Sequence, residues 1–224
     1  MRCSIIVPML NEAQGLPRLL ARLRALERQG CEVLIVDGGS DDGGAERAAQ
    51  AGFRVLSSPR GRARQMNQGA AHATGDVLLF LHADTQLPDG ALVTLRRALQ
   101  RSGAPWGRFD VVIEGRHPML RVVAWLMNLR SRWTGIATGD QAIFVTREAF
   151  DTVGGYPDQP LMEDIELSSR LLHRARPVCI RDRVQTSGRR WESRGVWRTV
   201  LLMWQLRWAY WRGAPAVQLA QRYR

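Results

Sequence analysis

The stretch Asp76-Val77-Leu78-Leu79-Phe80-Leu81-His82-Ala83-Asp84 decides how the rest of the chain is interpreted. Its apolar run follows a Gly75-Asp76 turn and ends in polar residues, which predicts a buried strand. Such a strand delivers His82 and Asp84 to a sheet edge, where α/β proteins place their ligand sites. A carboxylate two residues after an imidazole at this place suits a divalent cation held against a diphosphate. The alternative is a polar strand end followed by an ordinary turn from Thr85 to Gly90.

The segments before this stretch alternate between expected strands and expected helices. Strands are predicted at 3–8, 32–36 and 54–56 from their apolar runs. Helices are predicted from Asn11 to Gly30, from Ser40 or Asp41 as a cap to about 51, and in the segment that follows 60. Strand and helix in this rhythm predict right-handed βαβ units and a parallel sheet, so residues 1–100 are interpreted as a nucleotide-binding half.

The second half of the chain is less regular, and we interpret 101–190 as the acceptor half of the same domain, 1–190. Helices are expected over 92–99, 118–133, 147–153 and 163–174, and strands over 108–113, 139–145 and 177–180. No linker separates the halves.

Residues 191–224 are expected to form a helical extension rich in tryptophan and arginine. In its helix, 196–212, one stripe carries Trp197, Trp204 and Trp208 between arginines, and the opposite side is also partly apolar. Such a helix can pack on the domain with one face and lie on an anionic bilayer surface with the other. The alternative is a helix buried against the sheet or in a homodimer.

The charge of the chain indicates an anionic partner. The formal charge is +11, and all 32 basic residues are arginines. Eleven of them lie from Arg176 onward, against only Asp182 and Glu192, which favours phosphate, a lipid headgroup or nucleic acid. Three scattered cysteines argue against a disulfide framework. With no signal peptide or membrane-spanning run expected, we predict a cytoplasmic protein, peripheral at the cytoplasmic face of the inner membrane.

Several polar residues are candidates for site chemistry, each with an ordinary structural alternative. Asp37, at the end of the second strand, is placed to accept a hydrogen bond from a base or ribose, although Asp and Gly are common in such turns. Arginines 60, 62 and 64 can address a diphosphate. Glu163-Asp164 opens a helix, where the pair either complements the helix dipole or supplies a general base.

The order of the motifs carries more weight than any one of them. From the N-terminus they read Pro8-x-x-Asn11-Glu12, Val36-Asp37-Gly38-Gly39-Ser40-x-Asp42, Gln65-x-Asn67-x-Gly69, His82-Ala83-Asp84, Gly154-Gly155-Tyr156, and Glu163-Asp164-x-Glu166 with Arg170-Leu171. In this order and spacing the chain closely resembles the family-2 glycosyltransferases from Ser4 to about Trp191. It is most similar to the small stand-alone bacterial members found beside radical-SAM and selenium-related genes.

The resemblance implies a GT-A fold, a three-layer α/β/α arrangement with a mostly parallel central sheet. It also implies a nucleotide-diphosphate sugar as donor, inversion at the anomeric carbon, and a lipid-linked or small acceptor. Asp84 of the DXD-like motif would bind Mn²⁺ or Mg²⁺, with His82 as a second ligand, and Asp164 would be the catalytic base beside Glu163. The residues implied in donor binding are Pro8, Asn11, Glu12, Asp37, Gly38, Arg62, Arg64, Asn67, His82, Arg190 and Trp191.

Two residues depart from the common family pattern. His82 stands where many members have Asp, which leaves the number of metal ligands open, because His is a legitimate Mn²⁺ ligand but can equally contact ribose or water. Gly38 stands where another Asp is commoner, so one contact to the base or ribose is missing and the nucleotide is not named.

Two other function classes share parts of this pattern. A nucleotidyltransferase has a similar sheet and uses a metal ion in a similar way. It usually has a Gly-rich basic loop after the first strand, however, where this chain has Pro8-Met9-Leu10-Asn11-Glu12. A nucleic-acid-binding module would explain the charge and the tryptophans, but it leaves Asp37, Asp84 and Asp164 without a function. We therefore expect no nucleic-acid partner.

Overall fold

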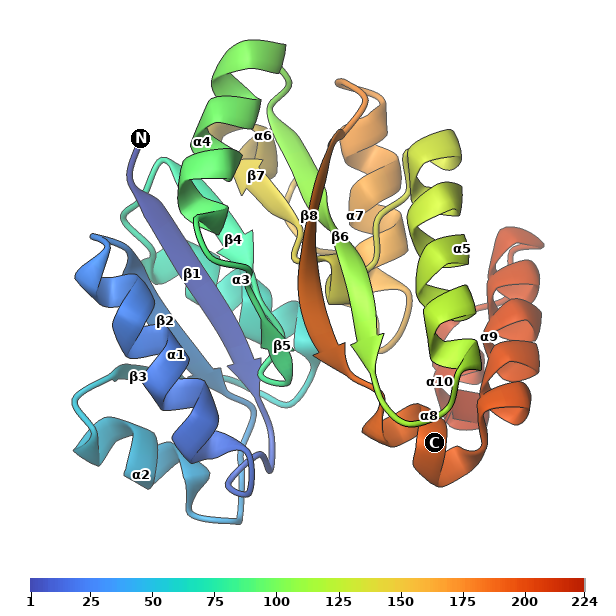
Figure 1. Cartoon of the computed structure of the whole chain (residues 1–224), viewed down its shortest axis with the longest axis horizontal. Helices are drawn as coiled ribbons and strands as arrows, with labels where there is room; N and C mark the ends of the chain where they lie inside the picture. Colours follow the sequence, from blue (N-terminus) through green and yellow to red (C-terminus); the bar gives the residue numbers. More distant parts are fainter. Residues whose placement is uncertain (224) are drawn as a thin grey trace.

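The computed structural model describes residues 1–223, and a central sheet of eight strands organises them (Figure 1). The strand order is β3-β2-β1-β4-β7-β6-β8-β5. Strands β1 to β4 pair in parallel, as do β6 and β8, whereas β7 runs antiparallel between β4 and β6, and β5 runs antiparallel to β8. The strands are β1 Cys3–Met9, β2 Glu32–Asp37, β3 Arg54–Ser57, β4 Val77–Phe80, β5 Thr85–Gln86, β6 Trp106–Glu114, β7 Phe144–Thr146 and β8 Val178–Ser187.

Helices cover both faces of this sheet, which confirms the predicted three-layer α/β arrangement (Figure 1). Helices α1 and α4 pack on one face, and α3, α6 and α7 pack on the other. The helices are α1 Leu16–Arg28, α2 Gly44–Gln50, α3 Arg62–His72, α4 Ala91–Ser102, α5 Met119–Thr134, α6 Arg147–Thr152, α7 Glu163–Leu172, α8 Arg189–Arg194, α9 Val196–Trp211 and α10 Ala216–Tyr223, with a short 3-10 helix η1 at Gly139–Gln141.

Strand β1 shows why the sequence builds two cores. Successive side chains of a strand point to opposite faces of the sheet. Ile5 and Val7 join the core under α1 and α4, whereas Ile6 joins the core under α3 and α7. All three are fully buried. A strand buried on both faces reads as a continuous apolar run, which is the pattern that predicted it.

Four local predictions were wrong at polar turns, and strand β8 extends to Ser187, beyond the predicted end at 180. Strand β4 ends at Phe80, before the predicted end at Asp84, because a turn closed by the Thr85 amide on the His82 carbonyl follows. Helix α1 begins at Leu16, because Asn11 has a left-handed φ of 54° and the Gly15 amide then closes a turn on the Glu12 carbonyl. Residues 139–145 form η1 and the three-residue strand β7 in place of one continuous strand.

The second helix also starts later than predicted, at Gly44, and it has no side-chain cap. Ser40 does not cap it, because the Ser40 hydroxyl donates to Asp37 and accepts from the Asn11 amide. The residues singled out as a helix cap therefore belong to the turn after β2, which is hydrogen-bonded to Asn11 in the loop after β1.

The extension after residue 190 packs back onto the domain as α9 and α10, while α8 spans its predicted boundary. Leu206 of α9 and Leu219 of α10 form a core with Leu161 and Met162, just before α7. Arg224, the last residue of the predicted extension, lies outside the described residues. Within residues 1–223, no helix is long and apolar enough to cross a membrane.

Candidate active site

The loops after β1 and β2 are locked together by side chains that bond to backbone amides. Asp37, at the end of β2, accepts hydrogen bonds from the amides of Gly39 (2.9 Å) and Ser40 (3.0 Å). The Asn11 side chain accepts from the Asp41 amide at 3.0 Å, and Asp42 accepts from the Ala13 amide at 2.7 Å. These hydrogen bonds hold the loops that follow β1 and β2 together as one rigid corner, and Asp37 is buried within it.

Helix α3 supports this corner from behind. The buried Gln65 side chain donates to the carbonyls of Met9 and Val36, both at 2.8 Å, and so ties the ends of the two strands. Gly38 must stay small, because a Cβ there would lie 3.0 Å from the Gln65 amide. Asn67 is also engaged by the fold: its amide group donates to the Tyr156 carbonyl (2.8 Å) and accepts from the Tyr156 amide (2.9 Å).

A carboxylate pair lies at the edge of the sheet beyond β1 and β4. Asp84 is exposed in the turn that links β4 to β5, and Glu12 is half-buried in the loop after Pro8. Burial raises the pKa of Glu12, and the nearby negative charge of Asp84 raises it further, against the lowering effect of Arg189. Arg189, which opens α8, forms an ion pair with Glu12 at 3.5 Å.

His82 points away from this pair and into the protein. Its Nδ1 lies 3.3 Å from Oδ1 of Asp140, in the short helix η1. Its Nε2 is buried without a hydrogen-bond partner among the described residues, and a side chain at Gly139 would collide with it. Both ring nitrogens thus face protein, so the predicted metal contact by His82 would require the imidazole to turn.

Asp140 is a charged residue of the site that the sequence analysis did not single out. Burial alone would raise its pKa, but the hydrogen bond with His82 and the charges of Arg62 and Arg190 hold that pKa below its usual range. The residue lies in a segment predicted to be a strand, which hid its position. The sequence does contain a signal for the start of η1, because Thr138 and Gln141 have the three-residue spacing of a capping box.

The first residues of α7 carry the two carboxylates predicted to be catalytic. Asp164 Oδ2 accepts from the Gly139 amide and Oδ1 from the Ile165 amide, both at 2.8 Å. Burial, with the adjacent charge of Glu163, raises the pKa of Asp164 to about 6. Glu163 is itself buried and lies 3.5 Å from Nη1 of Arg62. A fixed carboxylate that titrates near neutral pH has the properties of a general base.

The other predicted arginines take different places. Arg190 contributes charge at Asp140, stacks over the Tyr223 ring at 4.3 Å and donates to the Tyr223 hydroxyl. Trp191 packs against the small core under α5 and α9. Arg64 makes a two-pronged ion pair with the exposed Asp158, at 2.7 and 2.9 Å, and so holds the start of α3 to the loop before α7.

The residues present suit a hard divalent cation only in part. Within residues 1–223 no three His, Cys, Asp or Glu side chains are gathered as a metal site. Mg²⁺ and Mn²⁺ are commonly held by one or two carboxylates, with substrate phosphates completing the coordination. Asp84 is exposed and Glu12 lies near enough to sense its charge, so the two carboxylates could supply such ligands, although Glu12 already forms an ion pair with Arg189.

Comparison with known proteins gives a consistent result. The family model described as Glycosyl transferase family 2 matches residues 4–154. The undecaprenyl-phosphate 4-deoxy-4-formamido-L-arabinose transferase of Klebsiella pneumoniae is 36% identical over 154 residues, which cover 62% of this chain and 46% of that protein. The chain thus spans about a third to a half of the length of the curated relatives it matches.

Solved structures show the same fold at low sequence identity. The Pyrobaculum calidifontis mannosyltransferase PcManGT, in complex with GDP-Man and Mn²⁺, has a TM-score of 0.61 at 23% identity, covering 82% of this chain and 56% of that one. The S. aureus protein TarS with UDP-GlcNAc has a TM-score of 0.65 at 17% identity, covering 84% and 58%. At these identities the likeness concerns the fold alone.

Proposed function

The chain belongs to glycosyl transferase family 2, and we propose that it moves a sugar from a nucleotide-diphosphate donor to an acceptor hydroxyl, with inversion at the anomeric carbon. The observation that carries this proposal is Asp164, a carboxylate fixed by two backbone amides, with a pKa raised to about 6; Asp84 and Glu12 are a separate pair of neighbouring carboxylates. One end of the site thus offers a base, and the other offers ligands for a diphosphate-bound cation.

Asp164 would remove the proton from the acceptor hydroxyl as that oxygen attacks the sugar. Its two hydrogen bonds, to the amides of Gly139 and Ile165, fix the direction of the carboxylate. Because its pKa is raised, it holds a proton more tightly than an ordinary aspartate does and is still ionised at neutral pH. The negative charge of Glu163 adds to the rise in the pKa of Asp164, and the positive charge of Arg62 limits it.

The donor would lie against the corner formed by Asp37, Asn11 and Glu12. Asp84, with Glu12 opposite, would hold Mn²⁺ or Mg²⁺, which would neutralise charge on the leaving diphosphate. Arg189 and Arg190 at the start of α8, and Arg62 at the start of α3, bring positive charge to the same space. Positive groups fixed before the reaction stabilise charge that develops in the transition state.

The acceptor is proposed to be lipid-linked and reached from the cytoplasmic face of the membrane. A relative from Klebsiella pneumoniae is an undecaprenyl-phosphate 4-deoxy-4-formamido-L-arabinose transferase. The tryptophans of α9 that the sequence placed on one stripe are exposed, as a peripheral membrane protein requires.

A thermal-shift screen tests the proposal directly. The chain is heated with UDP, GDP or TDP and their sugars, with and without Mn²⁺, and release of the nucleoside diphosphate is then measured for the ligands that bind. We expect one nucleotide to raise the melting temperature, and to do so more strongly with Mn²⁺. Stabilisation by random DNA, with none by any nucleotide, would contradict the proposal and favour the nucleic-acid-binding alternative.

A further inference from the structure

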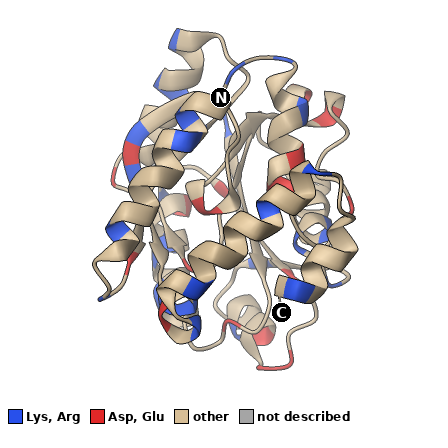
Figure 2. Cartoon of the chain, turned by 90° about the vertical axis from the view of Figure 1, so that its right-hand side faces the viewer, with Lys and Arg blue, Asp and Glu red and all other residues tan. Residues whose placement is uncertain are grey.

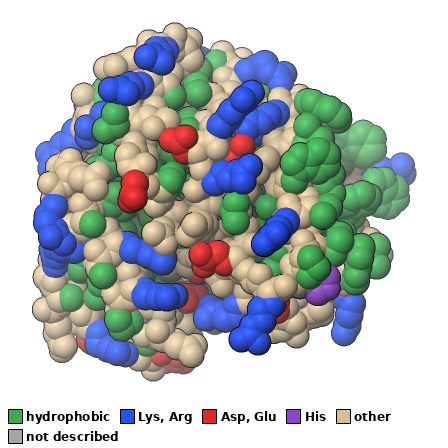
Figure 3. Space-filling view, in the orientation of Figure 1, with side chains coloured by type: hydrophobic (Ala, Val, Ile, Leu, Met, Phe, Trp, Pro, Cys, Tyr) green, Lys and Arg blue, Asp and Glu red, His purple; other side chains and the backbone are tan. Residues whose placement is uncertain are grey.

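One side of the molecule exposes large apolar side chains on two helices far apart in the chain. Helix α5 and helix α9 lie side by side at the right of Figure 1, and hydrophobic side chains gather there in Figure 3. Six tryptophans on these helices have exposed fractions between 60% and 80%. We call this surface the tryptophan face; its residues are Val122, Trp125, Leu126, Trp133, Trp197, Leu201, Trp204, Trp208 and Trp211. Isolated exposed apolar residues are ordinary, but a patch of this kind indicates an interaction surface.

The helices that carry the tryptophan face have no acidic residue. Helix α5 includes Arg121, Arg130 and Arg132, and helix α9 includes Arg198 and Arg207, without a single Asp or Glu in either. This side of the molecule faces the viewer in Figure 2. The tryptophan face is therefore both apolar and positively charged. Binding to an uncharged protein partner would not need this excess of arginines.

A groove of about 450 Å³ opens between α5 and the strands β6 and β8. Trp125 belongs to both this groove and the tryptophan face. Arg121, Arg181 and Arg183 line the groove and are exposed, and none of the three makes an ion pair or side-chain hydrogen bond within residues 1–223. The groove shares no lining residue with the candidate active site, so the arginines are not part of the donor pocket.

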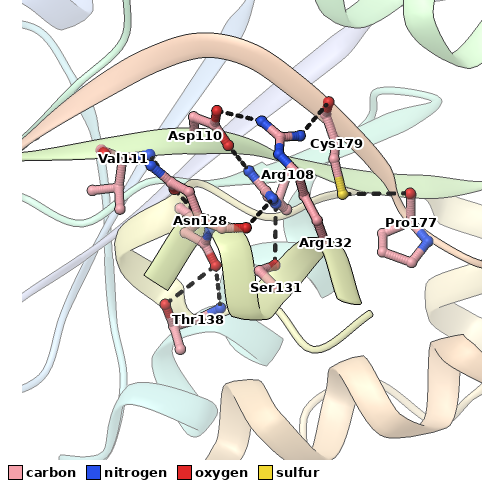
Figure 4. Close-up of polar contacts among 10 residues, drawn as sticks. Arg108, Asp110, Val111, Asn128, Ser131, Arg132, Thr138, Pro177 and Cys179 are labelled. Atoms are coloured by element: carbon pink, nitrogen blue, oxygen red, sulfur yellow. Dashed lines mark hydrogen bonds and ion pairs between the residues drawn. The ribbon is translucent and has the colours of Figure 1, made fainter. Parts of the chain in front are cut away.

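The floor of the groove does not offset this positive charge. Its one carboxylate, Asp110, accepts hydrogen bonds from both Arg108 and Arg132 (Figure 4). Arg108 is fully buried and is held further by the Ser131 hydroxyl at 3.1 Å. Because Asp110 is already paired twice, the three free guanidinium groups above it are left to bind an anion from outside.

We infer that the tryptophan face and the arginine groove together form a docking surface for a membrane rich in anionic phospholipid, with headgroup phosphates bound by Arg121, Arg181 and Arg183. Tryptophan rings settle at the level of lipid headgroups, and arginine pairs with phosphate through two parallel hydrogen bonds. The inference deepens the proposed function, because it names the surface by which the transferase reaches a lipid-linked acceptor.

The charge distribution favours a bilayer over a second copy of the chain. A symmetric dimer through this face would bring the arginines of α5 and α9 against the same arginines, with no acidic residue on either helix to pair with them. An anionic bilayer meets both features of the surface at once, through its apolar interior and its phosphates.

Co-flotation with lipid vesicles tests the inference on the full chain. Vesicles of phosphatidylcholine alone are compared with vesicles that contain 30% phosphatidylglycerol. We expect the chain to float with the anionic vesicles and to bind neutral ones about tenfold more weakly, because arginines near an anionic surface add to the affinity. The variant Arg181→Ala/Arg183→Ala should lose most of that preference, and Trp204→Ala/Trp208→Ala should weaken binding to both kinds of vesicle.

Matched controls separate this surface from net charge and from the transferase site. Arg18→Ala/Arg47→Ala removes the same charge from exposed positions on α1 and α2, at the other end of the molecule, and should bind like the wild type (Figure 1). All variants should keep nucleotide binding, so a failed vesicle test would leave the proposed function standing. Equal binding to both vesicle types, equal loss in the control, or a dimer that Trp204→Ala/Trp208→Ala converts to a monomer would overturn the inference.

Discussion

Two polar regions of the proposed site, one assigned to the nucleotide and the other to the base, are built in different ways. On the nucleotide side, Asp37, Asn11 and Asp42 each accept hydrogen bonds from backbone amides of neighbouring turns, and their geometry is set by the backbone. On the acid side, Asp164 also accepts hydrogen bonds from two backbone amides, but it lies beside Glu163 at the start of a helix, and Arg62 pairs with Glu163.

The hydrogen bonds and charges around each group of carboxylates explain why their pKa values differ. Hydrogen bonds from backbone amides favour the charged form of a carboxylate, and those from Ala13 and Gly44 hold the pKa of Asp42 below its ordinary value. A carboxylate kept half-buried next to another carboxylate stores an unfavourable charge, which is what raises its proton affinity. In the proposed reaction the first region would bind the donor, and the second would supply the base.

The largest effect is expected from Asp164→Asn, which removes the base and keeps the size of the side chain. We expect turnover to fall by about 10²–10⁴-fold, the usual contribution of a general base. Steady-state release of nucleoside diphosphate measures it. The control is Asp158→Asn, an exposed carboxylate in the loop before α7 that pairs only with Arg64 among the described residues. Similar losses in both variants would show that the acid side acts through structure and not through one reactive group.

A smaller effect is expected from Arg62→Ala, compared with Arg64→Ala two residues away. Arg62 pairs with buried Glu163, whereas Arg64 pairs with exposed Asp158. Removing Arg62 leaves a buried carboxylate without its partner, so we expect roughly tenfold slower turnover, and less than twofold for Arg64→Ala, because exposed ion pairs contribute about 0–1 kcal/mol. Turnover of the two variants at one pH checks this. Equal effects would erase the contrast between the two arginines.

The dependence of the rate on pH tests the role of Asp164 separately. A base must be deprotonated to act, and burial beside Glu163 places the pKa of Asp164 at about 6. We therefore expect the rate to be constant above that pH and to fall about tenfold for each unit below it. In Arg62→Ala the midpoint should move upward, because the Arg62 charge lowers the pKa of Asp164. A midpoint near 4 in the wild type would mean that Asp164 is not the titrating base.

The smallest effect on chemistry is expected from Asn67→Ala, on the nucleotide side. Asn67 makes two hydrogen bonds to the backbone of Tyr156, so its loss should lower the free energy of unfolding by roughly 1–3 kcal/mol and leave turnover at low temperature nearly unchanged. Urea unfolding measures this. Gln68→Ala is the control on the same helix, since the Gln68 side chain makes no hydrogen bond to described residues. A loss of turnover without loss of stability would instead return Asn67 to the donor site.

The sequence could predict what depends on periodic burial and on short motifs. The βαβ rhythm of the first half, the strand that leads to His82, and the Glu163-Asp164 start of α7 all follow from apolar period and turn residues. The interlocking of Asn11, Ser40 and Asp42 could not be predicted, because it joins loops that are distant along the chain. For the same reason Asp140 was missed, since its importance comes from the side chains folded around it.

The proposed division of the site into a donor-binding side and a reactive side can be tested with two variants, Asp84→Ala and Asp164→Asn. Calorimetric titration would measure how tightly each variant binds the nucleotide diphosphate with and without Mn²⁺. We expect Asp84→Ala to lose the part of its affinity for the nucleotide diphosphate that depends on Mn²⁺. Asp164→Asn should bind the nucleotide diphosphate as the wild type does and lose only sugar transfer. Equal loss of nucleotide binding in both variants would contradict the division of the site into a donor-binding side and a reactive side.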